Sequence, residues 1–229
     1  MRRLGVLTGL AAERRIIERV EQGAVHACRC AGADSARAAC DVAALIDAGA
    51  QALLSFGLAA GIDAAAPPGT VLCPDRVVFA DGEALATHPD WGEAVSAAAA
   101  AAGLAVRRGA IAATERLLAT SADKRALGAR TGALAADMES GPLARAAALA
   151  GLPHLAIRAV ADPVERALPD WLGSIVRADG GVAALTLAKR LSLRPWELPA
   201  LARLACDAGA GLAGLRGAAG LGSALFAVA

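Results

Sequence analysis

The chain is poor in aromatic residues and contains no long apolar run. Aromatic side chains make up 3% of its 229 residues and tyrosine is absent, so alanine and aliphatic residues account for most of the 56% hydrophobic content. No stretch supplies the roughly twenty uninterrupted apolar residues that a membrane-spanning helix needs. Charged residues begin again at Glu13, too early for the apolar region of a signal peptide. We therefore expect a cytoplasmic protein that does not cross a membrane.

The chain also lacks close cysteine pairs of the metal-binding type and an excess of charge of either sign. Its five cysteines are scattered, and Cys28 and Cys30 are separated by one residue rather than the two of a zinc knuckle. The three histidines are isolated in the sequence. We predict buried, reduced thiols, no metal site and no other cofactor. A formal net charge of +1 offers no basic surface for nucleic acid, which favours a small molecule as the partner.

Short apolar runs alternate with longer, alanine-rich segments along the chain. The short runs have the length of buried strands, and several of the longer segments end at glycine or proline, as helices do. We expect strands at residues 4–8, 52–56, 71–73, 76–79, 106–113 and 155–162, and helices at 12–21, 36–48, 90–102, 143–152, 168–191 and 198–215. This alternation predicts one α/β domain over residues 1–229, a three-layer α/β/α sandwich with a twisted, mostly parallel central sheet.

Acidic residues stand where these elements meet. Asp137 and Glu139 open one helix, Asp162 ends the strand that follows it, and Glu13 lies in the first turn of the first helix. The small residues 57–61 form an expected turn at the end of another strand. Ligands of open α/β sheets bind outside the carboxyl ends of the strands. The sequence therefore predicts one small-molecule site at this edge.

Three carboxylates at one edge could share the cleavage of a glycosidic bond. Glu139 could accept hydrogen bonds from a ribose diol, a second carboxylate could deprotonate water, and a protonated third could donate to the leaving group. The same residues could instead be unrelated helix caps and ion-pair partners. Arg158 shares a strand face with Asp162, but four strand residues separate their backbones by roughly 13 Å, so a direct pair needs a long reach.

Four segments resemble motifs of the nucleoside phosphorylase and nucleosidase superfamily, particularly its 5′-methylthioadenosine/S-adenosylhomocysteine nucleosidases. In the order of the chain, the first resembles the family's first strand with its water-handling Glu, and the second resembles the family's small-residue ribose loop. The third resembles the family's Met-Glu signature, and the fourth resembles the family's strand that ends in a purine-protonating Asp. The four segments are Gly5–Glu13, Ser55–Gly61, Ala136–Glu139 and Arg158–Asp162. The resemblance covers nearly the whole chain and implies a nucleoside substrate and a homodimer.

The resemblance also implies roles for single residues. Asp162 would protonate N7 of a leaving adenine, and Glu13 would position the attacking water. Glu139 would bind the 2′ and 3′ hydroxyls, with Met138 packed on the ribose. The remaining substrate contacts would come from Gly9, Leu58, Ala59, Leu117 and Leu118.

Three positions depart from the pattern of these relatives. Ala161 stands where they usually have a serine that orients the acid, Leu117 falls at the purine-stacking aromatic, and Leu58 replaces a polar loop residue. With the region from Leu168 to Glu197, these departures resemble the hopanoid-associated phosphorylases or nucleosidases more closely. That subgroup implies release of adenine from adenosylhopane, a substrate with an apolar 5′ group.

Several alternatives stay open. The substrate could be methylthioadenosine or S-adenosylhomocysteine, or the protein could be a catalytically weak nucleoside-binding protein, as Ala161 and Leu117 suggest. A carboxylate at Glu13 repels phosphate and favours hydrolysis. A phosphate-dependent purine nucleoside phosphorylase is kept in view by Arg14, Arg15, Arg107 and Arg108.

The last segment, Gly217–Ala229, is uncharged and rich in glycine. It could be a disordered tail, a packed end or a weak peripheral contact with a membrane. The sequence does not decide among the three.

Overall fold

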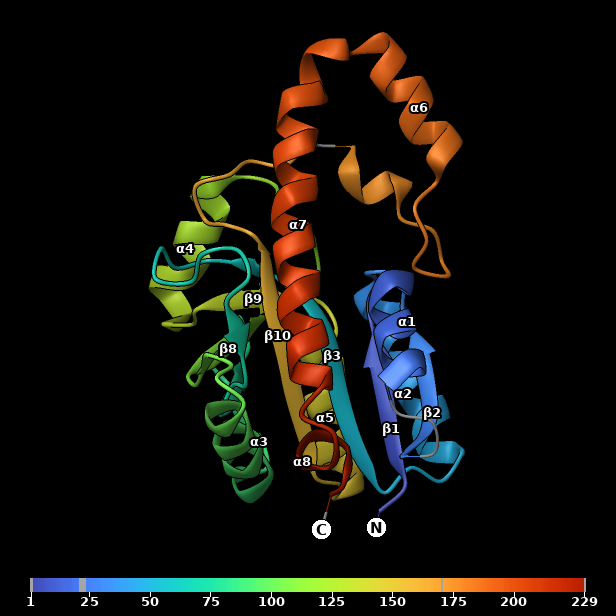
Figure 1. Cartoon of the computed structure of the whole chain (residues 1–229), viewed down its shortest axis with the longest axis vertical. Helices are drawn as coiled ribbons and strands as arrows, with labels where there is room; N and C mark the ends of the chain where they lie inside the picture. Colours follow the sequence, from blue (N-terminus) through green and yellow to red (C-terminus); the bar gives the residue numbers. More distant parts are fainter. Residues whose placement is uncertain (1, 21–23, 170, 229) are drawn as a thin grey trace.

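A twisted sheet with helices on both faces forms the body of the computed structural model, which describes residues 2–20, 24–169 and 171–228 (Figure 1). The strands are β1 (Leu4–Thr8), β2 (Val25–Cys30), β3 (Ala52–Gly61), β4 (Val71–Leu72), β5 (Arg76–Val78), β6 (Ala84–Ala86), β7 (Val106–Arg107), β8 (Ala110–Ala113), β9 (Ala135–Asp137) and β10 (His154–Asp162). The α-helices are α1 (Ala11–Val20), α2 (Ser35–Asp47), α3 (Pro89–Ala101), α4 (Ser121–Thr131), α5 (Ser140–Ala150), α6 (Ala184–Leu193), α7 (Leu198–Ala219) and α8 (Ser223–Phe226), and two 3₁₀ helices are η1 (Leu172–Ile175) and η2 (Pro195–Glu197). The predicted α/β class is confirmed.

Most neighbouring strands of the sheet are parallel. The strand order is β6-β5-β8-β9-β3-β10-β4-β7, with β1 also paired to β3 and β2 paired to β1. The antiparallel pairs are β10 with β4, β3 with β9, and β5 with β6. Because β1, β3 and β10 run in the same direction, their carboxyl ends meet at one edge. That edge is where the sequence predicts the site.

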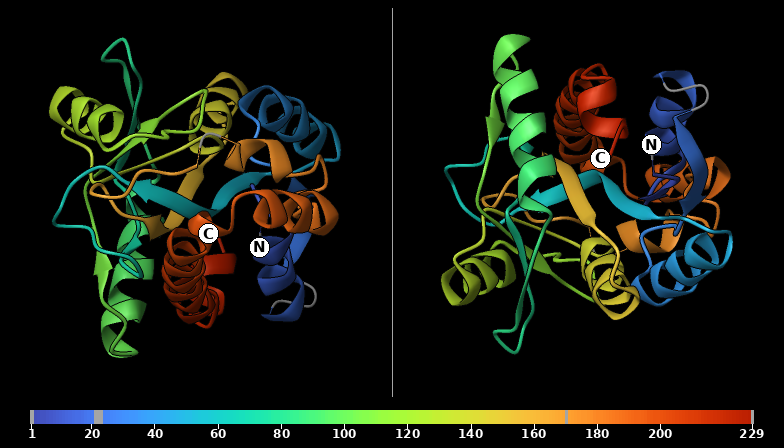
Figure 2. Two further views of the ribbon diagram at one scale, coloured as in Figure 1. Left: turned by 90° about the horizontal axis from the view of Figure 1, so that it is seen from above. Right: turned by 90° about the horizontal axis from the view of Figure 1, so that it is seen from below.

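Two apolar clusters attach the helices to the two faces of the sheet. On one face, β1, β3 and β10 pack against α1, α3, α7 and α8. On the other face, Leu7 of β1 and Leu53 of β3 pack against α2 and α5. Successive side chains of a strand point to opposite faces, so β1 and β3 each contribute to both clusters. Figure 2 shows the two helix layers on either side of the sheet and confirms the predicted three-layer arrangement.

The boundaries of several strands differ from the prediction. Residues 57–61 continue β3 rather than form a turn; residues 57–60 pair with β10, and residues 60–61 pair with β9. The strand expected at 106–113 is divided into β7 and β8 at Gly109, whose φ is 135°. The sequence does not predict β2, β6 or β9, because these strands are short or half-exposed and contain no buried apolar run of ordinary strand length.

The prediction of a single helix over residues 168–191 is wrong. Between η1 and α6 the chain reverses, and Val176 forms an isolated β-bridge with Val182. Gly180 adopts a φ of 76° in this reversal, a conformation that glycine reaches without steric strain. The glycine therefore interrupts a segment whose leucine and alanine content is otherwise typical of a helix.

The C-terminal segment is a packed end up to Val228. Leu225 and Phe226 of α8 are fully buried, and Trp91 Nε1 donates to the carbonyl oxygen of Leu225 at 3.0 Å. These apolar side chains belong to the core, so they are not presented to a membrane. Among the helices of the described residues, none has both the length and the apolar character needed to cross a bilayer.

Candidate active site

Glu13 ties the end of β1 to the middle of β3. Its Oε2 atom accepts hydrogen bonds from the backbone N–H groups of Gly9 and Leu10, each at 2.8 Å. Its Oε1 atom accepts from the N–H of Leu58, also at 2.8 Å. The side chain is buried, and burial raises its pKa against the lowering effects of Arg158 and the three N–H groups. The carboxylate is thus held rigidly at the predicted edge.

Arg158 of β10 is the largest fully buried side chain of the described residues. Its guanidinium forms an ion pair with Asp137 and lies 3.4 Å from Glu139 Oε2. It also donates to the hydroxyl of Ser55, which joins β3 to this network. Arg158 therefore pairs with the carboxylates at the end of β9. Within the described part of the chain, Arg158 and Asp162 form no ion pair.

Two glycines make room for this charged cluster of Glu13, Asp137, Glu139 and Arg158. A Cβ atom added at Gly9 would lie 2.6 Å from Glu139 Oε1. A Cβ added at Gly57 would lie 2.5 Å from Arg158 Nη1 and 2.7 Å from Glu13 Oε2. The small residues of β3 thus allow buried charges to pack against the strand backbone. Close packing of charges, rather than the predicted turn, therefore explains the glycine at position 57.

One guanidinium faces three carboxylates in the charged cluster. If all were ionised, two negative charges would remain uncompensated out of water, which is costly. Burial raises the pKa of Glu139 to about 8, although Arg158 acts to lower it, and the charges of Asp137 and Glu13 add repulsion. Burial and the neighbouring negative charges therefore favour the protonated form of Glu139 in the free protein.

Asp162 has a different counter-ion, Lys124 of α4. Lys124 Nζ lies 2.6 Å from Asp162 Oδ2 and donates to the carbonyl oxygens of Pro163 at 3.0 Å and Arg166 at 2.8 Å. Burial raises the pKa of Asp162 to about 6, while Lys124 acts to lower it. Burial also lowers the pKa of Lys124, opposed by Asp162. Among the described residues, Asp162 Oδ1 is buried with no hydrogen-bond partner.

Lys124 is a site residue that the sequence does not predict, and it supplies a polar contact to Asp162 that Ala161 cannot provide. The lysine lies far from Asp162 in sequence, within a mixed polar segment that gave no motif. One signal was present: the chain has 23 cationic residues, and only Lys124 and Lys189 among them are lysines. A rare lysine in an arginine-rich chain is therefore a candidate for a buried, ion-paired position.

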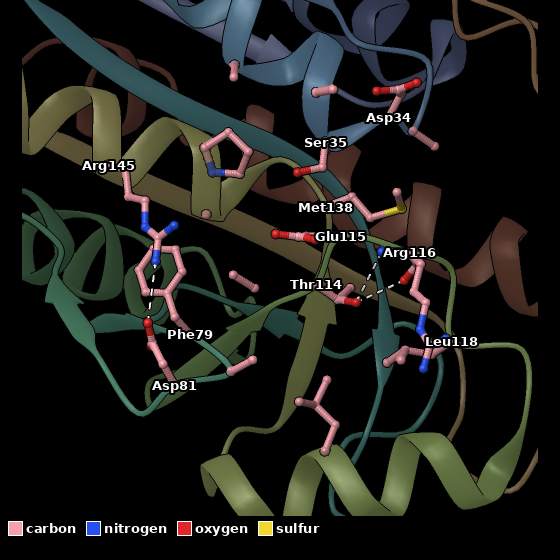
Figure 3. Close-up of a pocket in the computed structure, with 18 of the residues that line it drawn as sticks. Asp34, Ser35, Phe79, Asp81, Thr114, Glu115, Arg116, Leu118, Met138 and Arg145 are labelled. Carbon is pink, nitrogen blue, oxygen red and sulfur yellow. Dashed lines mark hydrogen bonds and ion pairs between the residues drawn. The ribbon is translucent and has the colours of Figure 1, made fainter.

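Met138 connects the charged cluster to an open cleft. The cleft has a volume of about 1370 Å³ and is lined by α2, α4, α5 and the segment after β8. Met138 and Leu118 contribute to its wall, and Figure 3 shows Met138 facing Ser35 of α2. Glu139, the next residue, is instead buried in the cluster. The Met-Glu pair therefore lies at the boundary between the cleft and the buried charges.

The other predicted contact residues occupy three kinds of surroundings. Leu58 is half-buried beneath α7, where a Cβ added at Gly211 would lie 2.8 Å from Leu58 Cδ2. Ala59 and Leu118 are buried in apolar clusters. Leu117, in contrast, is 40% exposed, so the two neighbouring leucines lie in different surroundings.

The pKa of Glu139 predicts how stability depends on pH. Because this pKa is raised from 4.5 to about 8, the folded state keeps a proton that the unfolded chain releases, and stability falls as pH rises between those values. Glu139→Gln should reduce that fall by on the order of a few kcal/mol, measured by urea unfolding across this range. Glu18→Gln, at an exposed ion pair with Arg14, is the control and should leave the slope unchanged. An identical slope in wild type and Glu139→Gln would contradict the assignment.

Comparisons with known proteins gave a family match and several structures of similar fold. The family described as the phosphorylase superfamily matches residues 11–188, whereas a search of curated proteins gave no significant match. One similar structure is a mutant 5′-methylthioadenosine/S-adenosylhomocysteine nucleosidase from Helicobacter pylori, with 5′-methylthioadenosine in its active site. It superposes with a TM-score of 0.67 at 14% sequence identity, and the match covers 84% of this chain and 99% of that one. S-adenosylhomocysteine nucleosidase from Streptococcus pyogenes gives 0.64 at 18% identity, covering 72% and 85%. A Helicobacter pylori futalosine hydrolase mutant gives 0.63 at 16% identity, covering 70% and 89%.

At these identities the superpositions establish a shared fold and no more. The family match is a separate finding, and it spans well over half of the chain, from α1 into α6. The chain belongs to the phosphorylase superfamily.

Proposed function

We propose that this protein hydrolyses the N-glycosidic bond of a 5′-substituted adenosine and releases adenine. The observation that carries the proposal is the division of its buried carboxylates into two environments. Glu13 and Glu139 share Arg158, whereas Asp162 has its own cation, Lys124. Two carboxyl environments with different counter-ions can be tuned separately, as a site that needs both an acid and a base requires. The nucleosidases of similar fold support a nucleoside as the ligand.

Asp162 is the proposed acid toward N7 of the departing adenine. Its pKa of about 6 lets it carry a proton closer to neutral pH than an ordinary aspartate does. Lys124 engages Oδ2, which leaves the unpartnered Oδ1 to face the base. Lys124 also weakens the case for a catalytically weak binding protein, because it compensates for Ala161.

The charged cluster is the proposed ribose and water site. A carboxylate offers about four acceptor positions, and backbone N–H groups occupy three of them on Glu13, so one remains for the attacking water. Glu139 is the proposed partner of the 2′ and 3′ hydroxyls, with Met138 beside the sugar. Because Gly9 has no side chain, Glu139 can lie close to the backbone that follows β1.

The arginines that kept phosphorolysis in view do not gather around Glu13. Arg14 pairs with Glu18 at 3.3 Å, Arg107 donates to a backbone carbonyl, and Arg108 donates to Cys73 Sγ at 3.1 Å, while Arg15 is exposed. Arg158 is near Glu13 but is already shared with two carboxylates. An anionic phosphate would meet net negative charge there, which favours water as the nucleophile.

For the 5′ group we propose an apolar substituent, with adenosylhopane as the substrate. Such a group suits a site in which Leu58 and Leu117 stand where the methylthioadenosine enzymes have a polar and an aromatic residue. Methylthioadenosine or S-adenosylhomocysteine is the alternative. A single domain over residues 1–229, a homodimer and a cytoplasmic location belong to the same proposal.

The function is tested by measuring adenine release from adenosylhopane, methylthioadenosine and adenosine, each with and without phosphate. We expect phosphate-independent release, fastest with adenosylhopane, and a loss of roughly 10²–10⁴-fold in Asp162→Asn. Strict dependence on phosphate would eliminate hydrolysis, and turnover of methylthioadenosine alone would eliminate the hopanoid substrate. Unchanged turnover in Glu139→Ala would support the non-catalytic alternative.

The contact between Lys124 and Asp162 predicts a change in the pH–rate profile when Lys124 is replaced. Because Lys124 lowers the pKa of Asp162, its removal in Lys124→Met should raise that pKa. The protonated acid then persists to higher pH, so the descending limb of kcat/KM should move to higher pH by about one unit. Lys124→Arg retains the charge and should show a smaller displacement. A uniform loss of rate with no displacement in Lys124→Met would indicate a structural role only.

A further inference from the structure

An arch of residues 182–203 projects beyond the carboxyl edge of the sheet. It comprises Val182, α6, η2 and the first turns of α7, and Figure 1 shows it rising above β1 and β10. The chain leading into the arch contacts the site, because Ala11 N donates to the carbonyl oxygen of Gly180 at 2.9 Å. The chain leaving it packs on β3 and β10, where a Cβ added at Gly211 would lie 3.2 Å from Ala161 Cβ. Both ends of the arch are therefore fixed beside the candidate active site.

The arch carries most of the exposed large apolar side chains. Five of the seven such residues among the described part of the chain belong to it. They are Val182, Leu185, Leu193, Trp196 and Leu198. Neither α6 nor η2 buries any residue. Exposed apolar residues are ordinary when scattered, but a cluster of this kind indicates an interaction surface.

Cationic side chains are interleaved with these apolar ones. Leu185, Lys189 and Leu193 follow one another at four-residue steps, which places them on one face of α6. The arch has four cationic residues and one carboxylate, whereas the whole chain has a net charge of only +1. The four are Lys189, Arg190, Arg194 and Arg203. Glu197 is occupied, because it accepts from Trp171 Nε1 at 2.9 Å and pairs with Arg194 at 3.2 Å.

We propose that the arch docks on the surface of an anionic phospholipid bilayer. Leucine and tryptophan side chains insert at the boundary between headgroups and acyl chains, and lysine and arginine keep their charges among anionic headgroups. A second copy of the arch fits less well, because a two-fold contact would bring its cationic patches together. Nucleic acid would match the charge but leave Leu185, Leu193 and Trp196 without an apolar environment.

Docking places the candidate active site next to the lipid surface, because both ends of the arch begin there. A nucleoside with an apolar substituent partitions into a bilayer, so the arch would bring the site to such a substrate. The proposal concerns binding alone and does not depend on the chemistry proposed above. Lipid binding without turnover, or turnover without lipid binding, would separate the two.

The test is flotation of the full-length chain with vesicles of phosphatidylcholine, with and without phosphatidylglycerol. We expect binding that requires phosphatidylglycerol and weakens with salt, and binding about tenfold weaker in Leu185→Glu. Leu149→Glu is the matched control, because Leu149 is 91% exposed on α5 and Leu185 is 88% exposed on α6. Absence of binding to phosphatidylglycerol vesicles, or equal losses in both variants, would overturn the proposal.

Tryptophan fluorescence gives an independent measurement without a charge reversal. Trp91 and Trp171 are buried, whereas Trp196 is 72% exposed. Vesicles should shift the emission to shorter wavelength, brominated lipids should quench it, and both effects should vanish in Trp196→Phe. Persistence of both effects in Trp196→Phe would contradict docking through the arch. Dissociation of an oligomer by Leu185→Glu in sedimentation velocity, with vesicle binding unchanged, would assign the surface to a second copy instead.

Discussion

The buried guanidinium of Arg158 is the constraint on which the rest of the site depends. It lies among Glu13, Asp137 and Glu139 on the carboxyl side of the sheet, with little water to screen any of the charges. The cost of burying the cluster falls if one carboxylate stays protonated and if backbone N–H groups stabilise another. The raised pKa of Glu139 and the three hydrogen bonds to Glu13 meet these two conditions.

The second constraint is that the acid must be kept apart from this cluster. β10 carries both Arg158 and Asp162, and four residues of extended strand separate them. Lys124 of α4 compensates the charge of Asp162, so the pKa of Asp162 can be tuned independently of the carboxylates around Arg158. In this account a lysine from a helix takes the orienting role that relatives are expected to give to the serine before the acid.

Much of the fold and the order of the site residues could be predicted from the sequence. Buried strands such as residues 4–8 and 155–162 are mostly apolar, and Glu13, Glu139 and Asp162 follow one another in family order. Lys124 could not be placed, because a contact across 38 residues follows from tertiary packing and leaves no local pattern. The chain reversal at Gly180 was hidden by helix-like composition, since one glycine conformation outweighs the propensity of its neighbours.

The central claim is that water attacks the sugar while the protein protonates the base. The most direct measurement is a single turnover in ¹⁸O-enriched water containing unlabelled phosphate, with immediate borohydride reduction to fix the oxygen at C1 of the released sugar. The account predicts free adenine and, by mass spectrometry, one ¹⁸O atom at C1 of the reduced sugar. An unlabelled sugar, or a sugar 1-phosphate, would contradict it.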